Sequence, residues 1–290
     1  MSPPVAVVTG ANSGIGRAAA IHLAVNGYQV FGTVRSLDKA SKLRAMADQC
    51  GASISLIELD IADDESVRNG FAAVLQQAGR VDLLVNNAGI GGNAVTEECP
   101  TSLYLDVFNV NVCGAARCIQ AVLPGMRDRG SGCIVNITSV AGRVCAVGQS
   151  PYFTSKWALE GLSEGLAHEL APFGIRVAIV EPGVTKSAIF AKNIDAPNQS
   201  GAYDSHYQRL FQLYATGLAN ATDPFDVGAV ILEAATTDKP HLRYPCSWGG
   251  SELIAGRAAM TDEQWVELGA TTNDEQYYEE FQRYFKLDLR

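Results

Sequence analysis

The chain has 290 residues, of which 47% are hydrophobic and 18% charged, and its formal net charge is −9. This composition is typical of a soluble globular protein, and the length fits one large α/β domain or two small domains. The acidic balance argues against binding of nucleic acid or of an anionic membrane surface, and no apolar run reaches the roughly 18 residues of a membrane-spanning helix.

In the first part of the chain, apolar runs of strand length alternate with amphipathic stretches of helix length. The predicted strands are residues 5–9, 29–35, 53–59, 81–86, 133–138 and 176–181. The predicted helices are residues 15–26, 38–49, 63–78, 101–129 and 152–171. Such alternation builds βαβ units, whose right-handed crossovers give a parallel sheet with helices on both faces. The predicted fold class is therefore α/β, with a doubly wound parallel sheet of the Rossmann type.

The pattern loosens after Pro182. Residues 186–220 are polar and aromatic-rich with little periodicity, and we expect a lid there, because long irregular insertions on a rigid scaffold are often functional. Its aromatic side chains either line an apolar pocket or cover the sheet; they are Phe190, Tyr203, Tyr207, Phe211 and Tyr214. Further on, we predict a helix at 222–235, a last strand at 242–248, and one or two helices at 261–285.

The amino terminus and the cysteines indicate the compartment. The chain starts Met1-Ser2-Pro3-Pro4, without the basic region and small-residue cleavage site of a secretory signal. The 7 cysteines form no C-x-x-C pair and the 4 histidines are scattered, so the sequence predicts neither a disulfide framework nor a metal site. We expect a cytoplasmic protein with free thiols.

A glycine-rich turn, T-G-A-N-S-G-I-G at residues 9–16, follows the first predicted strand and opens the first helix. Its glycines allow a tight turn and a close approach to a pyrophosphate, which the free N–H groups of the helix favour. The spacing differs from the usual G-x-G-x-x-G fingerprint, so the motif alone leaves a plain structural turn open. The candidate contacts to a dinucleotide in this turn are Gly10, Asn12, Ser13, Gly14, Ile15 and Gly16.

The ends of the second and third predicted strands bear on which dinucleotide is bound. Arg35 and Ser36 stand where a protein that binds NAD would carry an acidic residue. An arginine side chain forks onto phosphate, so Arg35, assisted by Ser13, predicts a preference for NADP, with NAD possible; a solvated loop charge is the alternative. Asp60 either contacts the adenine or is the N-cap of the next helix.

Tyr152 and Lys156 are four residues apart in a predicted helix and therefore face the same way. A neighbouring ammonium group favours the phenolate, so it lowers the pKa of Tyr152 and makes that side chain a usable general acid or base. Ser139, at the end of the fifth predicted strand, is placed to hold a substrate oxygen. Asn111 is polar within an otherwise apolar helix, where asparagine is unfavourable, unless the backbone satisfies it. The alternative for the pair is a surface tyrosine and lysine.

Together these motifs resemble those of the short-chain dehydrogenase/reductase family, over roughly residues 5–235. The shared features, in order, are the glycine turn, N-N-A-G at residues 86–89, the helical asparagine, the strand-end serine, Y-x-x-x-K, and Pro182-Gly183. The resemblance implies that Tyr152 exchanges a proton with the substrate oxygen and that Lys156 lowers the pKa of Tyr152 and holds the nicotinamide ribose. It implies that Asn111 anchors a water in a proton relay, so the catalytic residues are Asn111, Ser139, Tyr152 and Lys156. The further cofactor contacts it implies are Ile61, Asn87, Ala88, Gly89, Pro182, Gly183, Thr185 and Ser187.

Within that family, the chain is most similar to the 17β-hydroxysteroid and retinol dehydrogenase branch, in residues 129–132, 152–162 and 239–244. This implies an NADP(H)-dependent oxidoreductase that interconverts a bulky lipophilic secondary alcohol and its ketone. The loop after Gly183 departs from the family pattern, since Thr185 replaces an aliphatic residue and Ser187 a threonine. The alternatives are a 3-oxoacyl thioester reductase and a catalytically silent protein that senses the dinucleotide.

The resemblance also bears on domains and assembly. We expect residues 1–250 to form the dinucleotide-binding and catalytic domain, and residues 251–290 to pack on it as a C-terminal extension. Family members commonly pair through the helices expected here at 101–126 and 152–172, which implies a homodimer or homotetramer.

Overall fold

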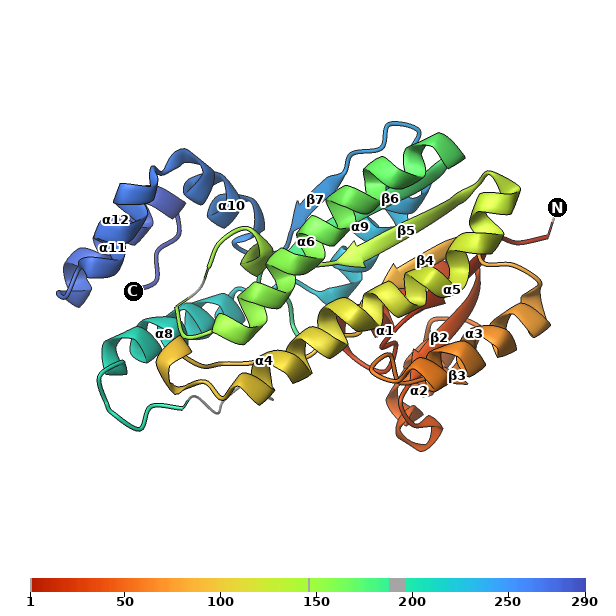
Figure 1. Ribbon diagram of the computed structural model, residues 1–290, viewed down its shortest axis with the longest axis horizontal. Helices are drawn as coiled ribbons and strands as arrows, with labels where there is room; N and C mark the ends of the chain where they lie inside the picture. Colours follow the sequence, from red (N-terminus) through yellow and green to blue (C-terminus); the bar gives the residue numbers. More distant parts are fainter. Residues whose placement is uncertain (1, 146, 188–196) are drawn as a thin grey trace.

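A parallel β-sheet covered by helices on both faces forms the centre of the molecule (Figure 1). The computed structural model describes residues 2–145, 147–187 and 197–290. Over these residues the strand order is β3-β2-β1-β4-β5-β6-β7, with all neighbours parallel. The strands are β1 (Val5–Val8), β2 (Gln29–Val34), β3 (Ile54–Glu58), β4 (Leu83–Asn86), β5 (Gly132–Ile137), β6 (Ile175–Pro182) and β7 (Arg243–Cys246). The predicted doubly wound α/β fold is therefore confirmed, as a single domain.

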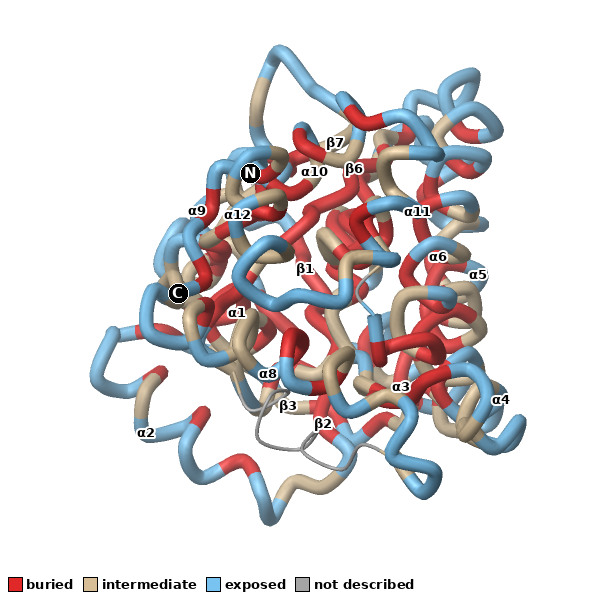
Figure 2. Tube along the Cα trace, turned by 90° about the vertical axis from the view of Figure 1, so that its left-hand side faces the viewer, coloured by how far each residue is buried: buried red, intermediate tan, exposed pale blue. Residues whose placement is uncertain are grey.

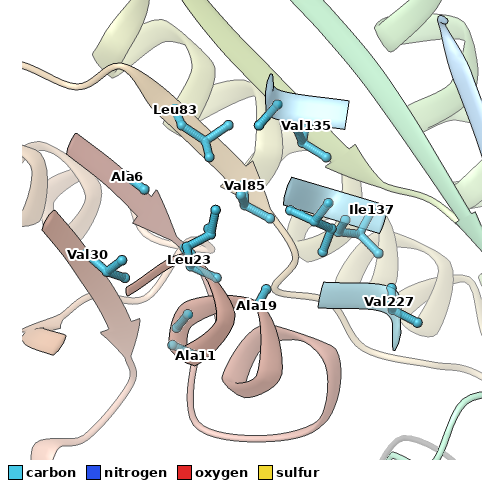
Figure 3. Close-up of a cluster of buried hydrophobic side chains, with 14 of the residues drawn as sticks. Ala6, Ala11, Ala19, Leu23, Val30, Leu83, Val85, Val135, Ile137 and Val227 are labelled. Carbon is cyan, nitrogen blue, oxygen red and sulfur yellow. The ribbon is translucent and has the colours of Figure 1, made fainter. Parts of the chain in front are cut away.

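A hydrophobic core on each face holds the helices against the sheet. Side chains alternate along a strand, so Ala6 and Val8 of β1 enter one core while Val5 and Val7 enter the other. The first core, part of which Figure 3 shows, joins the sheet to α1 (Gly14–Val25), α2 (Ser41–Gln49) and α9 (Pro224–Thr236). The second core joins it to α3 (Asp64–Ala78), α5 (Gly114–Arg129) and α6 (Ser150–Leu170). Figure 2 shows buried strands at the centre and exposed residues along outer helices such as α2.

The order of the strands determines where a ligand can bind. The chain crosses from β1 to β2 and β3 on one side, and then returns to place β4 on the other side of β1. At such a reversal the loops that follow the two central strands diverge and leave a crevice at the carboxyl ends of the strands. The glycine turn after β1 and the residues after β4 therefore flank this crevice.

The helix predicted at residues 101–129 contains an interruption. It consists of α4 (Thr101–Phe108), a π-helical segment at Asn109–Cys113, and α5. Single π-helical turns within α-helices occur frequently at functional sites. This one contains Asn111, the polar residue that stands out in the sequence.

The lid expected at residues 186–220 is partly helical. Residues 204–219 form α8 (Asp204–Ala219), which the sequence analysis missed, whereas residues 188–196, with Phe190, lie outside the described residues. The inward stripe of α8 includes Tyr207, Leu210, Tyr214 and Gly217, whose spacing of three and four residues is that of a helix. The polar residues between them hide this period in the sequence.

The last part of the chain forms three helices: α10 (Gly250–Ala259), α11 (Asp262–Ala270) and α12 (Asp274–Phe285). The prediction of one or two helices at 261–285 is confirmed as two, whereas α10 was not predicted. Gly256 permits close packing, since a Cβ there would lie 2.5 Å from Cδ1 of Phe285. Among the described residues, no helix is long and apolar enough to cross a membrane.

The packing of the C-terminal helices leads to a test by mutation. Phe285 is 1% exposed and belongs to the hydrophobic cluster that joins α10, α11 and α12 to Val144, near the end of β5. We expect Phe285→Ala to lower the free energy of unfolding by about 3–5 kcal/mol, through lost burial and the cavity left behind. Denaturant unfolding followed by circular dichroism measures this loss.

The matched control is Val266→Ala in α11, whose side chain is 68% exposed and should cost less than about 0.5 kcal/mol. We expect one cooperative transition in both variants, because the cluster that holds Phe285 also includes Val140 and Val144, which follow β5, and Leu213 of α8. A separate low-stability transition for the C-terminal helices would contradict this.

Candidate active site

A cavity of about 1230 Å³ extends along the carboxyl edge of the sheet, from the glycine turn to the C-terminal helices. Nearly all predicted site residues line it. They are Gly10, Asn12, Ser13, Gly14, Ile15, Arg35, Ser36, Asp60, Ile61, Asn87, Ala88, Gly89, Ser139, Tyr152, Lys156, Pro182, Gly183, Thr185 and Ser187. Gly16 and Asn111 are buried behind the cavity wall.

The glycine turn packs tightly against the end of β4. Gly10 has a φ of +67°, and a Cβ there would lie 2.9 Å from the Cα of Ala88. A Cβ on Gly16 would lie 2.3 Å from Nδ2 of Asn87 and 2.5 Å from the carbonyl oxygen of Gly10. Neither position has room for a side chain, so the backbone of the turn is left accessible to a ligand.

Hydrogen bonds lock this turn to the neighbouring strand end. The Nδ2 group of Asn87 donates to the carbonyl oxygen of Thr9 at 2.9 Å, and Oγ1 of Thr9 accepts from the backbone N–H groups of Asn87 and Ala88, each at 3.0 Å. The amide of Asn87 therefore braces the glycine turn. Thr9 belongs to the predicted glycine-turn motif, but its role in anchoring the turn was not predicted; its only signal is a hydroxyl at the end of a buried strand.

A group of basic side chains lies beside the glycine turn. Arg35 is exposed at the end of β2, and Lys39, one turn further on, also lines the cavity. Lys39, Arg17, Lys42 and Lys186 surround an adjoining hollow next to Asn12, Ser13 and Gly14. In a protein of net charge −9 this local excess of positive charge favours a phosphate. The sequence signal missed here is the spacing of basic residues after the second strand.

Asp60 does not cap α3, so that alternative is wrong. Asp63 is the N-cap, since its side chain accepts a hydrogen bond from the backbone N–H of Ser66 at 2.6 Å. Oδ1 of Asp60 instead accepts from the N–H of Ala62 at 3.0 Å, while both Asp60 and Ile61 line the cavity.

The second wall of the crevice follows β6. The backbone N–H of Val184 donates to the carbonyl oxygen of Trp248 at 2.9 Å, and a Cβ on Gly183 would lie only 2.1 Å from that oxygen. The hydroxyl group of Thr185 pairs with that of Ser247 at 2.8 Å. Ser187 reaches the glycine turn, because a Cβ added at Gly14 would lie 3.1 Å from its Cβ. The segment after β6 therefore closes over the turn after β1.

Tyr152 and Lys156 enter the cavity from the first two turns of α6. The Nζ atom of Lys156 lies 5.7 Å from the centre of the Tyr152 ring and donates to the carbonyl oxygen of Ile137 at 2.9 Å. A side-chain hydrogen bond links Ser139 to Tyr152. The predicted combination of phenol, ammonium and hydroxyl groups is therefore brought together at the end of β5.

The direction of the Tyr152 pKa differs from the expectation. Burial raises the pKa of Tyr152, and the hydrogen bond of Ser139 opposes this effect without reversing it. Burial also lowers the pKa of Lys156, to about 8, against the opposing charge of Glu160. Burial thus favours the neutral forms of both Tyr152 and Lys156. The four-residue spacing in the sequence shows that the two side chains are neighbours, but it does not show how deeply they are buried.

Asn111 holds two backbone segments together. Its Nδ2 group donates to the carbonyl oxygen of Ile90 and to Oγ of Ser155, both at 2.9 Å, while Oδ1 accepts from the N–H of Ile90 at 2.8 Å. Both amide donors are therefore used within the protein, which leaves one lone pair of Oδ1 for any other partner. This satisfied arrangement agrees with the alternative of an asparagine bonded by the backbone.

The far end of the cavity is mostly aromatic and aliphatic. Tyr214 of α8 hydrogen-bonds to Gln149 and, at 3.1 Å, to Oδ1 of Asn93. Beyond it the wall is formed by α8, which lies within the expected lid, and by α11 and α12, which were not predicted to reach the site. Side chains from these helices in the wall include Leu210, Leu213, Trp265, Leu268, Tyr277, Phe281 and Phe285.

Comparisons with known proteins agree with this geometry. The family model described as short chain dehydrogenase matches residues 4–198. A short-chain dehydrogenase structure from Streptomyces avermitilis aligns with a TM-score of 0.80 and 38% identity, over 93% of this chain and 99% of that one. A metagenomic short-chain oxidoreductase in complex with NADP aligns with a TM-score of 0.67 and 27% identity, over 84% and 96% of the two chains. The 17-beta-hydroxysteroid dehydrogenase type 1 of Mus musculus is 37% identical over 84% of this chain and 74% of its own length.

The tight contact at Gly16 gives a direct test of the glycine turn. In Gly16→Ala the new methyl group displaces Asn87 or the carbonyl of Gly10, so we expect a cost of roughly 1–3 kcal/mol in binding of a nicotinamide dinucleotide. Isothermal titration calorimetry measures it.

Gly161→Ala in α6 is the control, because a Cβ there meets no atom within 4 Å. That variant should bind the dinucleotide normally. Equal affinities for the two variants would show that the turn is not the binding element.

Proposed function

The chain belongs to the short-chain dehydrogenase/reductase family, and from that we propose that it is an NADP(H)-dependent oxidoreductase that interconverts a secondary alcohol and a ketone on a bulky lipophilic substrate. The observation that carries the proposal is the meeting of Ser139, Tyr152 and Lys156 in one cavity with the glycine turn after β1.

The described residues fit a nicotinamide dinucleotide. Gly10 and Gly16 carry no side chain, which lets the glycine turn pack closely against Ala88 and Asn87, and α1 begins at this turn, so its first N–H groups are available to a phosphate. Asp60 and Ile61 line the cavity on the side of β3, and Thr185 lines it after β6. When bound, the cofactor supplies or accepts the hydride, and the protein contributes placement and electrostatics.

Tyr152 is proposed to move the proton. In the direction of reduction, its phenol donates the proton to the carbonyl oxygen of the substrate while the carbonyl carbon receives hydride. The raised pKa of Tyr152 keeps the phenol protonated at neutral pH, which is the form that this direction requires. In this proposal Ser139, whose hydroxyl donates to the carbonyl oxygen of Pro182 at 3.4 Å in the structure, donates instead to the substrate oxygen, and the charged form of Lys156 stabilises the phenolate as it develops.

The preference for NADP is supported by the charge around the adenosine side of the cavity. Arg35 and Lys39 line that side, and Arg17, Lys42 and Lys186 add positive charge in the adjoining hollow. A guanidinium group can pair with the 2′-phosphate of NADP through two parallel, charged hydrogen bonds. The unphosphorylated ribose of NAD has no group that can accept this pair of bonds. Binding of NADP by the metagenomic relative is consistent with this preference.

A bulky lipophilic substrate is supported by the wall opposite the dinucleotide. That wall comes from α8, α11 and α12 and is mostly aromatic and aliphatic, and such pockets bind apolar ligands with few polar anchors. The named activity of the murine relative, a 17β-hydroxysteroid dehydrogenase, is of the same substrate type.

The proton-transfer role is tested by Tyr152→Phe. We expect turnover of a hydrophobic cyclic ketone to fall by about 10²–10⁴-fold, because the general acid is removed, while NADPH affinity stays close to that of the parent. Absorbance of NADPH at its nicotinamide band measures the rate, with an acyl thioester as the comparison substrate.

Tyr28→Phe is the matched control, since Tyr28 precedes β2 at the opposite edge of the sheet. Full turnover by Tyr152→Phe would refute the assignment. Faster reduction of the thioester than of the cyclic ketone by the parent protein would favour the thioester reductase instead.

Cofactor choice is tested by Arg35→Asp. Loss of a charged hydrogen-bonding partner for the 2′-phosphate should lower the NADP-to-NAD affinity ratio about 10- to 100-fold. Arg68→Asp on the exposed surface of α3 makes the same change of net charge away from the cavity and should leave the ratio unaltered. An unchanged ratio in Arg35→Asp would make Arg35 a surface charge only.

A further inference from the structure

One face of α6 carries a column of ionisable side chains at four-residue intervals. Tyr152, Lys156 and Glu160 follow one another on this face, and Glu164 continues it. Lys156 is 5% exposed and Glu160 is 4% exposed, whereas the side chain of Glu164 is 64% exposed. The column therefore places a buried carboxyl group one helical turn beyond the buried ammonium group.

Glu160 is held in place from other elements of the fold. Its Oε2 accepts a hydrogen bond from Nε of Arg243 in β7 at 3.0 Å. The same arginine donates through Nη2 to Glu164 at 2.6 Å. The short turn that follows β5 also packs on Glu160, since a Cβ on Gly142 would lie 2.9 Å from Cγ of Glu160.

A second buried carboxyl group, Glu181 of β6, completes the cluster. Its Oε1 lies 3.8 Å from Nε of Arg243 and 3.3 Å from Nη1 of Arg143. Burial and the neighbouring charge of Glu160 raise the pKa of Glu181 to about 7. The charged groups that face Glu160 are therefore Lys156 and Glu164 on its own helix, Arg243 on β7, Glu181 on β6 and Arg143 in the turn after β5.

The hydrogen bonds of Glu160 do not account for its burial. Its Oε1 is buried and has no hydrogen-bond partner among the described residues. A buried carboxylate with an unpaired oxygen destabilises the fold, so a hydrophobic side chain would serve the packing better. Its Oε2 is paired with Arg243, and the buried charged group one helical turn away on the same face of α6 is Lys156.

We propose that Glu160 is a positioning residue for the reaction: its carboxylate, clamped by Arg243, keeps the ammonium group of Lys156 charged inside the protein. This inference rests on the proposed function, in which a charged Lys156 acts on Tyr152. Burial favours the neutral amine and lowers the pKa of Lys156 to about 8, and the charge of Glu160 acts against that effect. In a region of low dielectric constant, one unit charge at a distance of one helical turn has a strong effect on the pKa of an ammonium group.

Glu160→Gln keeps the shape of the side chain and removes its charge. We expect the titration midpoint of Lys156 to fall by about one pH unit. NMR of protein labelled with ¹³Cε-lysine follows it without cofactor, and the signal is assigned by its absence in Lys156→Met. Glu164→Gln is the matched control, because Glu164 shares Arg243 but is exposed and lies two turns from Lys156.

The kinetic counterpart is the pH profile. A Lys156 that titrates lower loses its charge at lower pH, so the alkaline decline of kcat/KM in Glu160→Gln should move down by the same amount as the NMR midpoint. Near pH 6 Lys156 is charged in every variant, and the rate should stay close to that of the parent. Glu160→Asp keeps the charge and should restore the parent midpoint.

An unmoved Lys156 midpoint in folded Glu160→Gln overturns the proposal. If that variant does not fold, the double variant Glu160→Gln/Arg243→Gln is used, because it removes both members of the ion pair and leaves neither charge without its partner. The titration midpoint of Lys156 should fall in this double variant too. An unmoved midpoint there would equally overturn the proposal. A shifted midpoint with an unshifted pH profile supports the link between Glu160 and Lys156 and counts against the proposed function of Lys156.

Discussion

The removal of an ammonium group from water is the physical constraint around which this structure is organised. Lys156 sits beneath the carboxyl edge of the sheet with its Nζ bonded to the carbonyl oxygen of Ile137. A buried cation destabilises a protein unless fixed dipoles or opposite charges compensate for the lost hydration. Here the compensation comes from a strand-end carbonyl and from a carboxylate one turn away, so β5, β7 and α6 must all be in place for the charge to persist.

The same edge of the sheet depends on a second set of contacts, around the reversal of strand order. The Thr9 hydroxyl and the Asn87 amide tie the end of β1 to the end of β4, and Asn111 ties the next loop to α6 through Ile90 and Ser155. These polar side chains form hydrogen bonds with backbone N–H and C=O groups of the loops, which would otherwise have no partner. The crevice is thus rigid where the dinucleotide is proposed to lie, as precise placement of reacting groups requires.

The sequence predicts the elements whose pattern is local. Apolar strand runs, the glycine turn after β1 and the four-residue spacing of Tyr152 and Lys156 are all visible in short windows, and these features place most of the site. What it does not predict depends on residues far apart in the chain. The raised pKa of Tyr152 comes from burial by several elements, and Arg243 meets Glu160 across 83 positions. The helix α8 was not predicted because polar residues separate the members of its inward face, and the basic hollow forms only when Arg17 and Lys186 approach Lys39 and Lys42.

The two ends of the cavity are built from different parts of the chain, which has a consequence for specificity. The residues proposed for hydride and proton transfer belong to the sheet and α6, whereas the opposite wall comes largely from α8, α11 and α12. Arg209 of α8 joins these helices: it pairs with Asp274 at 2.8 Å, donates to the carbonyl oxygen of Thr271 and stacks on the ring of Tyr277 at 4.0 Å. Because this clamp touches none of the proposed catalytic residues, changes in the wall can alter the shape offered to a substrate while the charged column on α6 stays unchanged. The proposed chemistry and the proposed choice of substrate therefore depend on separate interactions within one fold.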